Sequence, residues 1–316
     1  MLHLRLIVPP DLLQRVLEML REAPAVTNLW HLENAASKPP GALVSCDVAK
    51  EEGSSLLRAL RELGIDRRGS IAVESVDASV SAGAVAAERA APGLPVDAVV
   101  WEEVERRVSE EAALSVSFLI LITVATMIAA IGVITDSIVL IIGAMVVGPE
   151  YGPLAGICVA LVDGRPRLAG RSLTALAVGF PLAIGCALLL TLALLGTGIA
   201  PDALGSEAQR ELTLFISRPN WYSAIVAVLA GVVGMLALVS AKSGALIGVL
   251  ISVTTIPAAA DVGVSLAYSS PEEALGAATQ LLINVTAILG SGLSVLLLAQ
   301  RARRRRPSWQ DEASVS

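Results

Sequence analysis

Long apolar stretches dominate the chain beyond residue 112 and restrict it to one class of fold. There are six such stretches, and the length of each is near or above the ~20 residues that a helix needs to cross a bilayer. They lie at about 113–135, 138–162, 172–197, 221–241, 244–268 and 274–300. Hydrocarbon offers no hydrogen bonds, so a spanning segment has to satisfy its own backbone as a helix. The sequence therefore predicts an α-helical integral membrane protein with six spans.

The composition agrees with this class and argues against several others. The chain is 54% hydrophobic and only 16% charged, whereas soluble proteins carry about 25% charged residues. Aromatic residues make up 3% of the chain and the net charge is -6, so we expect no nucleic-acid partner. Cys46, Cys158 and Cys186 are isolated in the sequence, and no HExxH motif occurs. We therefore expect no disulfide framework, no metal site, no cofactor and no enzymatic activity.

Residues 1–80 have the pattern of a small soluble domain. Alternation of apolar and polar residues predicts strands at 2–8, 25–33, 41–49 and 70–78, with a loop at 35–40. Helical spacing predicts one helix after Asp11 and another from Glu51. The order βαββαβ predicts an α+β ferredoxin-like domain, a fold often used for regulation. His3 and His31 fall on expected strands, and we interpret them as ordinary sheet residues rather than metal ligands.

Two further segments flank the membrane part. Residues 81–112 are expected to form a linker followed by an amphipathic helix with Val99, Val100, Val104 and Val108 on one stripe. That helix lies on the membrane surface or leads into the first span. Residues 113–300 then form the membrane domain, and residues 301–316 form a basic cytoplasmic tail.

The distribution of basic residues predicts the orientation in the membrane. Arg210 and Arg218 fall on one side of the six-span arrangement. The other side holds Arg106, Arg107, Arg165, Arg167, Arg171, Lys242, Arg301 and Arg303 to Arg306. Lys and Arg are enriched in cytoplasmic loops. We therefore expect a multi-pass protein of the inner (cytoplasmic) membrane with both termini in the cytoplasm and no cleaved signal peptide.

The two halves of the membrane domain resemble each other. A shift of the chain by 105 positions aligns Ile142 with Ile247, Gly143 with Gly248, Ala155 with Ala260 and Pro166 with Pro271. Each half holds three spans, an odd number, so the halves would insert with opposite topology. Inverted repeats with broken helices near the midplane are typical of secondary transporters.

Proline and small residues interrupt the second and fifth spans. The candidate pathway residues around these interruptions are Gly148, Pro149, Glu150, Gly152, Pro153, Thr254, Thr255, Pro257, Asp261 and Asn284. Proline removes a backbone donor, so such segments should face protein or water. Glu150 and Asp261 are the functional candidates, since an ionisable group at membrane depth is costly. Both carboxylates could instead lie near an interface or stabilise helix ends. Gln280, Asn284 and Thr286 either join the same cavity or form interhelical hydrogen bonds.

Several motifs resemble one known family. ATMIAAIGVITDSIVLIIGAMVVGPEYGPLAGICVALVDG, SGALIGVLISVTTIP and LLINVTAIL are similar to the motifs of the bacterial and archaeal hydrophobic membrane family known as domain of unknown function family 389. The resemblance covers about residues 112–300 and implies a membrane architecture without a defined activity. Glu150 departs from the apolar or small residue that many relatives have after the first proline.

These observations support two hypotheses of function. The first is a transporter or channel for a small solute or ion, gated by the cytoplasmic domain. The alternative is a non-transporting scaffold or sensor that oligomerises and binds a ligand through the N-terminal domain. The expected partners are membrane lipids and an unidentified small solute or ion. The sequence leaves homo-oligomerisation open.

Overall fold

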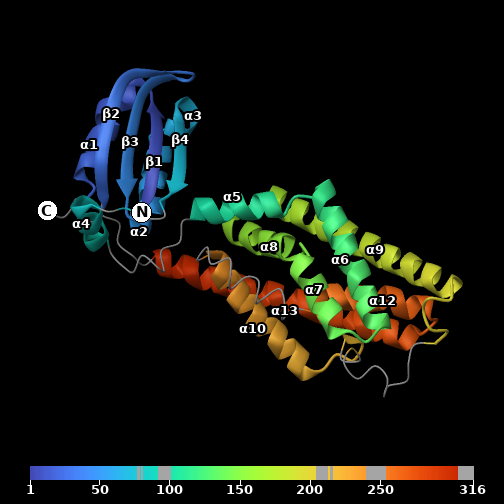
Figure 1. The fold of residues 1–316 in the computed structure, drawn as a ribbon. Coiled ribbons are helices and arrows are strands. Elements are labelled where there is room, and N and C mark those ends of the chain that lie inside the picture. The colour runs from blue at the N-terminus through green and yellow to red at the C-terminus, as the bar shows by residue number, and fades with distance from the viewer. Residues whose placement is uncertain are drawn as a thin grey trace. The chain divides into compact units, whose positions relative to one another are not determined.

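The computed structural model describes residues 1–76, 79, 81–91, 101–203, 213, 216–239 and 254–304 (Figure 1). The chain forms two compact units, one built on Met1–Val104 and the other on Glu105–Arg303. Several positions used in the sequence analysis lie outside the described residues, as does the tail beyond Arg304: Val99, Val100, Arg210, Lys242, Ile247, Gly248, Arg305 and Arg306.

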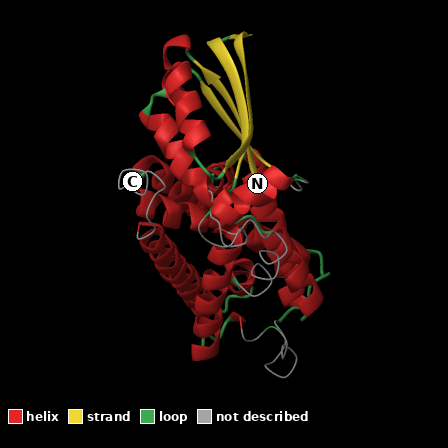
Figure 2. Cartoon of the chain, turned by 90° about the vertical axis from the view of Figure 1, so that its left-hand side faces the viewer, coloured by secondary structure: helices red, strands yellow, loops and turns green. Residues whose placement is uncertain are grey.

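The N-terminal unit is a four-stranded sheet covered by helices on one face (Figure 2). Its elements are β1 (Leu2–Val8), η1 (Pro10–Leu12), α1 (Leu13–Glu22), β2 (Val26–Ser37), β3 (Pro40–Val48), α2 (Lys50–Glu62), α3 (Ile65–Arg68), β4 (Ser70–Ser75) and α4 (Ala82–Ala90). The strand order is β2-β3-β1-β4, and every neighbouring pair is antiparallel. The small N-terminal sheet predicted from the sequence is therefore confirmed.

The core of this unit follows from the alternation in β1. Leu2, Leu4 and Leu6 point to the helical face and are fully buried. They pack in one cluster with α1 and α2 residues such as Leu17 and Leu60. Burying a leucine side chain contributes about 2 kcal/mol, so the period-two pattern fixes which face carries the helices.

Two segments of this unit differ from the sequence prediction. The expected loop 35–40 is mostly strand, because β2 continues to Ser37 and β3 begins at Pro40. Residues 82–90 were interpreted as linker but form α4, capped by the Ser81 hydroxyl, which accepts from the Ala84 amide. Ala84 and Ala87 lie in the core cluster of the sheet. The small alanine side chains permit close packing of α4 against this cluster.

The position of α4 leads to a prediction about fragments. A fragment of residues 1–91 should unfold cooperatively, and a fragment of residues 1–80 should be less stable by about 1–2 kcal/mol, because it exposes the apolar surface under α4. Urea unfolding followed by circular dichroism measures both values. Equal stability would mean that α4 contributes nothing to this unit.

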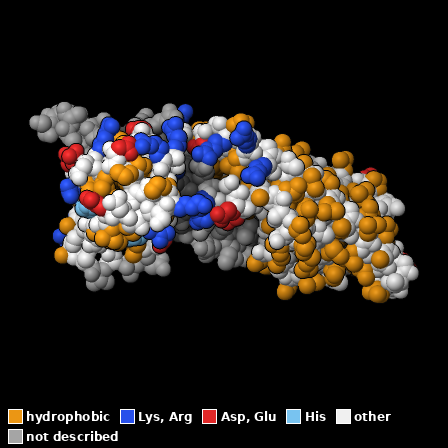
Figure 3. Space-filling view, turned by 90° about the horizontal axis from the view of Figure 1, so that it is seen from above, with side chains coloured by type: hydrophobic (Ala, Val, Ile, Leu, Met, Phe, Trp, Pro, Cys, Tyr) orange, Lys and Arg blue, Asp and Glu red, His pale blue; other side chains and the backbone are white. Residues whose placement is uncertain are grey.

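The membrane unit consists of helices. They are α5 (Trp101–Glu111), which begins in the N-terminal unit, α6 (Val116–Ile134), α7 (Ile138–Val147), α8 (Tyr151–Asp163), α9 (Pro166–Gly196), α10 (Trp221–Val239), α12 (Thr255–Ala267) and α13 (Pro271–Arg304). Four of these, α6, α9, α10 and α13, are long and apolar enough to cross a membrane. Helices α7 and α8 pass the same test as a pair bent by 46°. Hydrophobic side chains cover much of the visible surface of this unit (Figure 3).

Five of the six predicted stretches coincide with helices or a helix pair that pass this test, whereas the fifth stretch contains only the shorter helix α12 among the described residues. Residues 240–253, which include the first part of the predicted fifth span, lie outside the described residues, and α12 forms its second part. The expected amphipathic helix is present as α5, in which Val104 and Val108 are buried. Val99 and Val100 lie outside the described residues.

Helix boundaries recur along the membrane unit at the spacing seen in the sequence. Helices α6 and α10 each have 19 residues and begin at residues 116 and 221, a spacing of 105. Helices α9 and α13 begin at Pro166 and Pro271 with the same spacing. The N-caps also correspond, since Ser115 accepts from the Phe118 amide and Asn220 accepts from the Ser223 amide. The local signals that start helices are thus repeated.

Candidate functional site

The first predicted interruption separates α7 from α8. Helix α7 ends at Val147 and α8 begins at Tyr151, so Gly148, Pro149 and Glu150 form the break. Pro153 was expected to interrupt the span as well, but it lies in the first turn of α8. Proline is tolerated there because the first amides of a helix have no intrahelical partner. Pro149 is therefore the proline within the break.

The second predicted interruption precedes α12. Thr254 is the N-cap residue, and α12 begins at Thr255. Pro257 lies in the first turn of this helix, as Pro153 does in α8. Thr255 and Pro257 are buried.

A hydrogen bond joins the two interruptions. The Thr255 hydroxyl donates to Glu150 Oε1 at 2.6 Å. The Glu150 side chain is only 3% exposed, and within the described chain Oε2 has no hydrogen-bond partner. An added Cβ at Gly148 would overlap this second oxygen, so the glycine makes room for the carboxylate. A buried carboxylate, with one oxygen that accepts no hydrogen bond from the described residues, thus lies where the two segments meet.

A row of polar side chains extends from this point along α13. Asn284 Nδ2 donates to Thr254 Oγ1 at 2.8 Å, and Gln280 Nε2 donates to Asn284 Oδ1 at 3.1 Å. Ser223 Oγ of α10 lies 3.1 Å from Gln280 Oε1. We call Ser223, Gln280, Asn284 and Thr254 the polar row. Thr286 does not join it, because its hydroxyl donates to the Leu282 carbonyl of its own helix.

The remaining predicted residues lie elsewhere. Asp261 is fully buried on α12, six residues beyond Thr255, which corresponds to about 9 Å along a helix axis. The Ser265 hydroxyl donates to Asp261 Oδ1 at 3.4 Å. An added Cβ at Gly152 would lie 2.8 Å from the Cβ of Glu111, so this glycine permits close packing against the end of α5. The structure therefore brings together Gly148, Glu150, Thr254, Thr255 and Asn284 from the predicted group.

A hydrogen-bonded arrangement in the N-terminal unit gave no recognisable signal in the sequence. His3 Nδ1 lies 2.7 Å from Asp47 Oδ1, and Ser45 Oγ lies 3.0 Å from His3 Nε2. These are the residue types of a serine hydrolase triad, but Ser45 is only 1% exposed, so a substrate cannot reach its hydroxyl. The arrangement links β1 to β3.

The two histidines lie on opposite faces of the sheet. His3 is opposite Asp47 and His31 is opposite Val44, three residues apart on β3. Alternate strand residues point to opposite faces, so the two rings cannot share a metal ion. No group of three or more metal-binding side chains occurs among the described residues.

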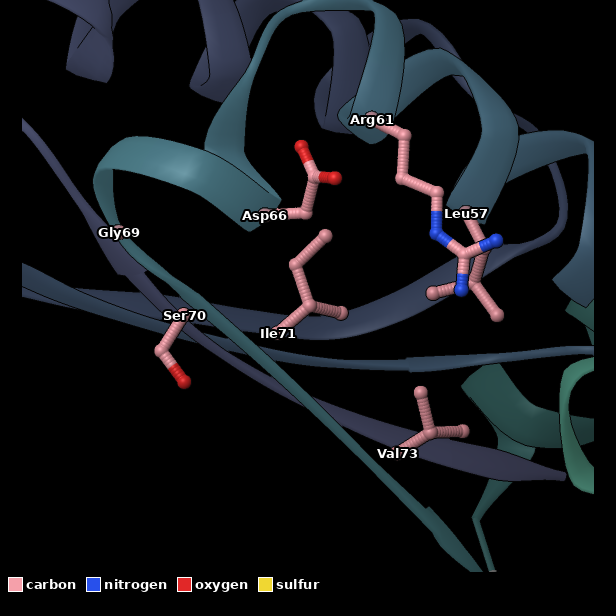
Figure 4. Close-up of a pocket in the computed structure, with 7 residues that line it drawn as sticks. All are labelled: Leu57, Arg61, Asp66, Gly69, Ser70, Ile71 and Val73. Carbon is pink, nitrogen blue, oxygen red and sulfur yellow. The ribbon is translucent and has the colours of Figure 1, made fainter. Parts of the chain in front are cut away.

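Each unit contains a hollow lined by charged side chains. In the N-terminal unit, a cavity of about 270 Å³ lies between α2, α3 and β4 (Figure 4). Its residues are Leu57, Arg61, Asp66, Gly69, Ser70, Ile71 and Val73. In the membrane unit, a groove of about 640 Å³ lies at the start of α9 and is lined by Arg165, Arg167 and Arg171. A charged cavity and a basic groove are thus present outside the break.

Burial makes the only thiol of the N-terminal unit unreactive. Burial and, to a smaller extent, the neighbouring Asp47 charge raise the pKa of Cys46 to about 12. The thiolate is the reactive form, and at pH 8 only about one thiol in 10,000 would be ionised. Cys46 in the folded fragment 1–91 should therefore resist iodoacetamide at pH 8 and react in urea, as measured by mass spectrometry. Rapid labelling without denaturant would contradict this burial.

The geometry defines a class of protein: a membrane protein in which the bent pair α7 and α8 meets the start of α12 at a buried carboxylate. Residues 145–289 match the family described as "Domain of unknown function (DUF389)", so the family resemblance noted in the sequence is confirmed.

One relative gives a second comparison. An uncharacterized protein of Methanocaldococcus jannaschii is 26% identical over 191 residues, which cover 60% of this chain and 56% of the relative. The chain thus spans little more than half the length of that relative. No solved structure matches the chain.

Proposed function

We propose that the protein is a transporter or channel for a small solute or ion whose pathway passes Glu150. The hydrogen bond between Glu150 and Thr255 carries this proposal, because it joins two broken helices at a buried charge. A carboxylate at membrane depth costs about 3 kcal/mol even on the lenient insertion scale, so a functional role is the default interpretation. Broken helices at this depth are tolerated where they line a cavity.

The pathway would lie between two inverted repeats of three spans each. Glu150 and Thr255 occupy equivalent positions at the spacing of 105, and they contact each other, as equivalent residues beside a two-fold axis do. Helix contacts away from this point correspond as well. Cys158 Sγ lies 3.5 Å from the Leu289 carbonyl, and at the equivalent position Gly263 an added Cβ would lie 2.8 Å from the Ile184 carbonyl. Both observations support an inverted repeat with six spans in total.

The charges at equivalent helix starts support the expected orientation. The start of α9 carries Arg165, Arg167 and Arg171, whereas the start of α13 carries Glu272 and Glu273. In an inverted repeat these two starts lie on opposite sides of the membrane. By the positive-inside rule, the start of α9 and both termini would then lie in the cytoplasm, with the protein in the inner membrane.

The N-terminal unit would regulate the pathway. Its antiparallel strand order β2-β3-β1-β4 fits a ferredoxin-like fold, in which β3 lies between the parallel strands β1 and β2. The cavity beside Arg61 and Asp66 would hold a small polar effector.

The apolar side chains of Trp30 and Leu32 are 48% and 54% exposed. This exposure favours a second candidate function, a scaffold that binds a partner or a second copy of the chain.

Flux measurements test the proposal. Purified protein in liposomes should carry one of a panel of monovalent cations, anions or small neutral solutes faster than empty liposomes do. Liposomes with heat-denatured protein serve as the control for leakage. If none of these solutes crosses faster, the transport proposal fails and the scaffold function is favoured.

A further inference from the structure

We infer that the polar row is the access route for a monovalent cation, open toward only one side of the membrane. This inference rests on the proposed transport function and adds the class of permeant and the direction of access. The row joins Ser223 at the start of α10 to the partly exposed Thr254 and, through the adjacent buried Thr255, to the Glu150 carboxylate. It therefore connects one end of the membrane unit with the proposed site.

The exposure of the row changes along its length. Ser223 is partly exposed and follows Trp221 and Tyr222, which are 86% and 80% exposed. Exposed aromatic residues of this kind are typical of a membrane interface. Gln280 and Asn284 are each only 1% exposed. The row thus begins at the membrane surface and leads into the protein interior.

The first half of the membrane unit lacks such a row at the equivalent positions. At the spacing of 105, Phe118 corresponds to Ser223 and Gly179 corresponds to Asn284. An added Cβ at Gly179 would lie 2.8 Å from Cε1 of Phe118, so the ring fills this space. In an inverted repeat this equivalent lies on the other side of the membrane. The polar groups therefore lead to one surface, and Phe118 closes the route toward the other.

The chemistry of the row selects the charge of the permeant. Each side chain of the row carries an oxygen that can accept a hydrogen bond or coordinate a cation. The Glu150 carboxylate lies at the inner end of the row. The spans of α10 and α12 and residues 271–300 of α13 contain no Lys or Arg. A single carboxylate among neutral oxygens balances one positive charge and disfavours an anion. Because amide groups do not exchange protons as carboxyl groups do, the row suits a cation better than a chain of proton transfers.

Cysteine accessibility tests the row in the full-length protein. Asn284→Cys, in a variant whose native cysteines are replaced by serine or alanine, should react with a cationic methanethiosulfonate applied from the side where α10 begins. Reaction with the anionic reagent should be at least about tenfold slower, as focused electrostatic fields allow. Gly179→Cys should stay unreactive from either side. Unreactive Asn284→Cys, or faster reaction with the anion, would overturn the inference.

Flux through a second pair of variants keeps the test decisive if the cysteine variant fails to fold. Asn284→Leu should lower cation flux at least about tenfold, which corresponds to the loss of one hydrogen-bonding partner. Thr286→Val is the matched control, because Thr286 lies on the same helix but bonds only to its own backbone; its flux should stay within about twofold. Equal flux in both variants would overturn the row and leave the proposed transport function standing. Absence of flux in the unmodified protein would instead overturn the transport function itself.

Discussion

Glu150→Gln should lower solute flux by up to about 100-fold while the protein remains folded and inserted. The amide keeps the shape of the side chain and can still accept a hydrogen bond from Thr255, but it loses the charge. A hydrogen bond to a charged group contributes up to about 3 kcal/mol, and each 1.4 kcal/mol changes an affinity by a factor of ten. Initial flux in liposomes, normalised to the amount of folded protein, measures the effect.

The control for this change is the same substitution at an exposed carboxylate. Glu272→Gln at the start of α13 removes the same charge from an exposed position and should leave flux within about twofold. Thr255→Val removes the hydroxyl that holds Glu150 and should have an intermediate effect of about tenfold. If Glu150→Gln transported normally, the carboxylate would have a structural role and the proposed pathway would be wrong. If the variant failed to fold, the charge would belong to a buried pair whose loss costs about 3–5 kcal/mol.

Gly263→Leu should destabilise the membrane unit by about 3 kcal/mol or more. An added Cβ at Gly263 would lie 2.8 Å from the Ile184 carbonyl and 3.0 Å from the Leu188 nitrogen, so α12 approaches the backbone of α9 closely. Two helix backbones cannot move apart locally, and overpacking of a tight interface is destabilising. The fraction of purified protein that stays monodisperse after heating, measured over a range of temperatures, reports the loss of stability.

Gly290→Leu is the matched control for this prediction. Gly290 lies on α13, where an added Cβ would meet nothing within 4 Å. The same substitution there should be neutral or slightly stabilising, because leucine favours helix more than glycine by about 0.5–1 kcal/mol. Equal loss of stability in the two variants would show that the effect comes from added bulk in any span and not from the contact with α9.

The sequence by itself determined the elements that depend on local signals. Alternation in Leu2–Val8 specified a strand with one buried face, and the length of the apolar stretches specified helices that span a membrane. Pro149 specified the break between α7 and α8, since proline cannot continue the preceding turn. The local pattern was less reliable for α4, where alanine and glycine were compatible with a linker and with a packed helix.

Only the tertiary structure decided which of these elements meet. Glu150 and Thr255 are 105 residues apart, and nothing near either residue in the sequence indicates that they form a hydrogen bond. The same holds for Asn284 with Thr254 and for His3 with Asp47. The repeat predicted that the two breaks are related, but it did not predict that Asp261 lies apart from Glu150 along α12. Periodicity specifies the faces of a helix or strand, whereas the contact between two faces depends on how distant segments pack, and that is a property of the folded chain.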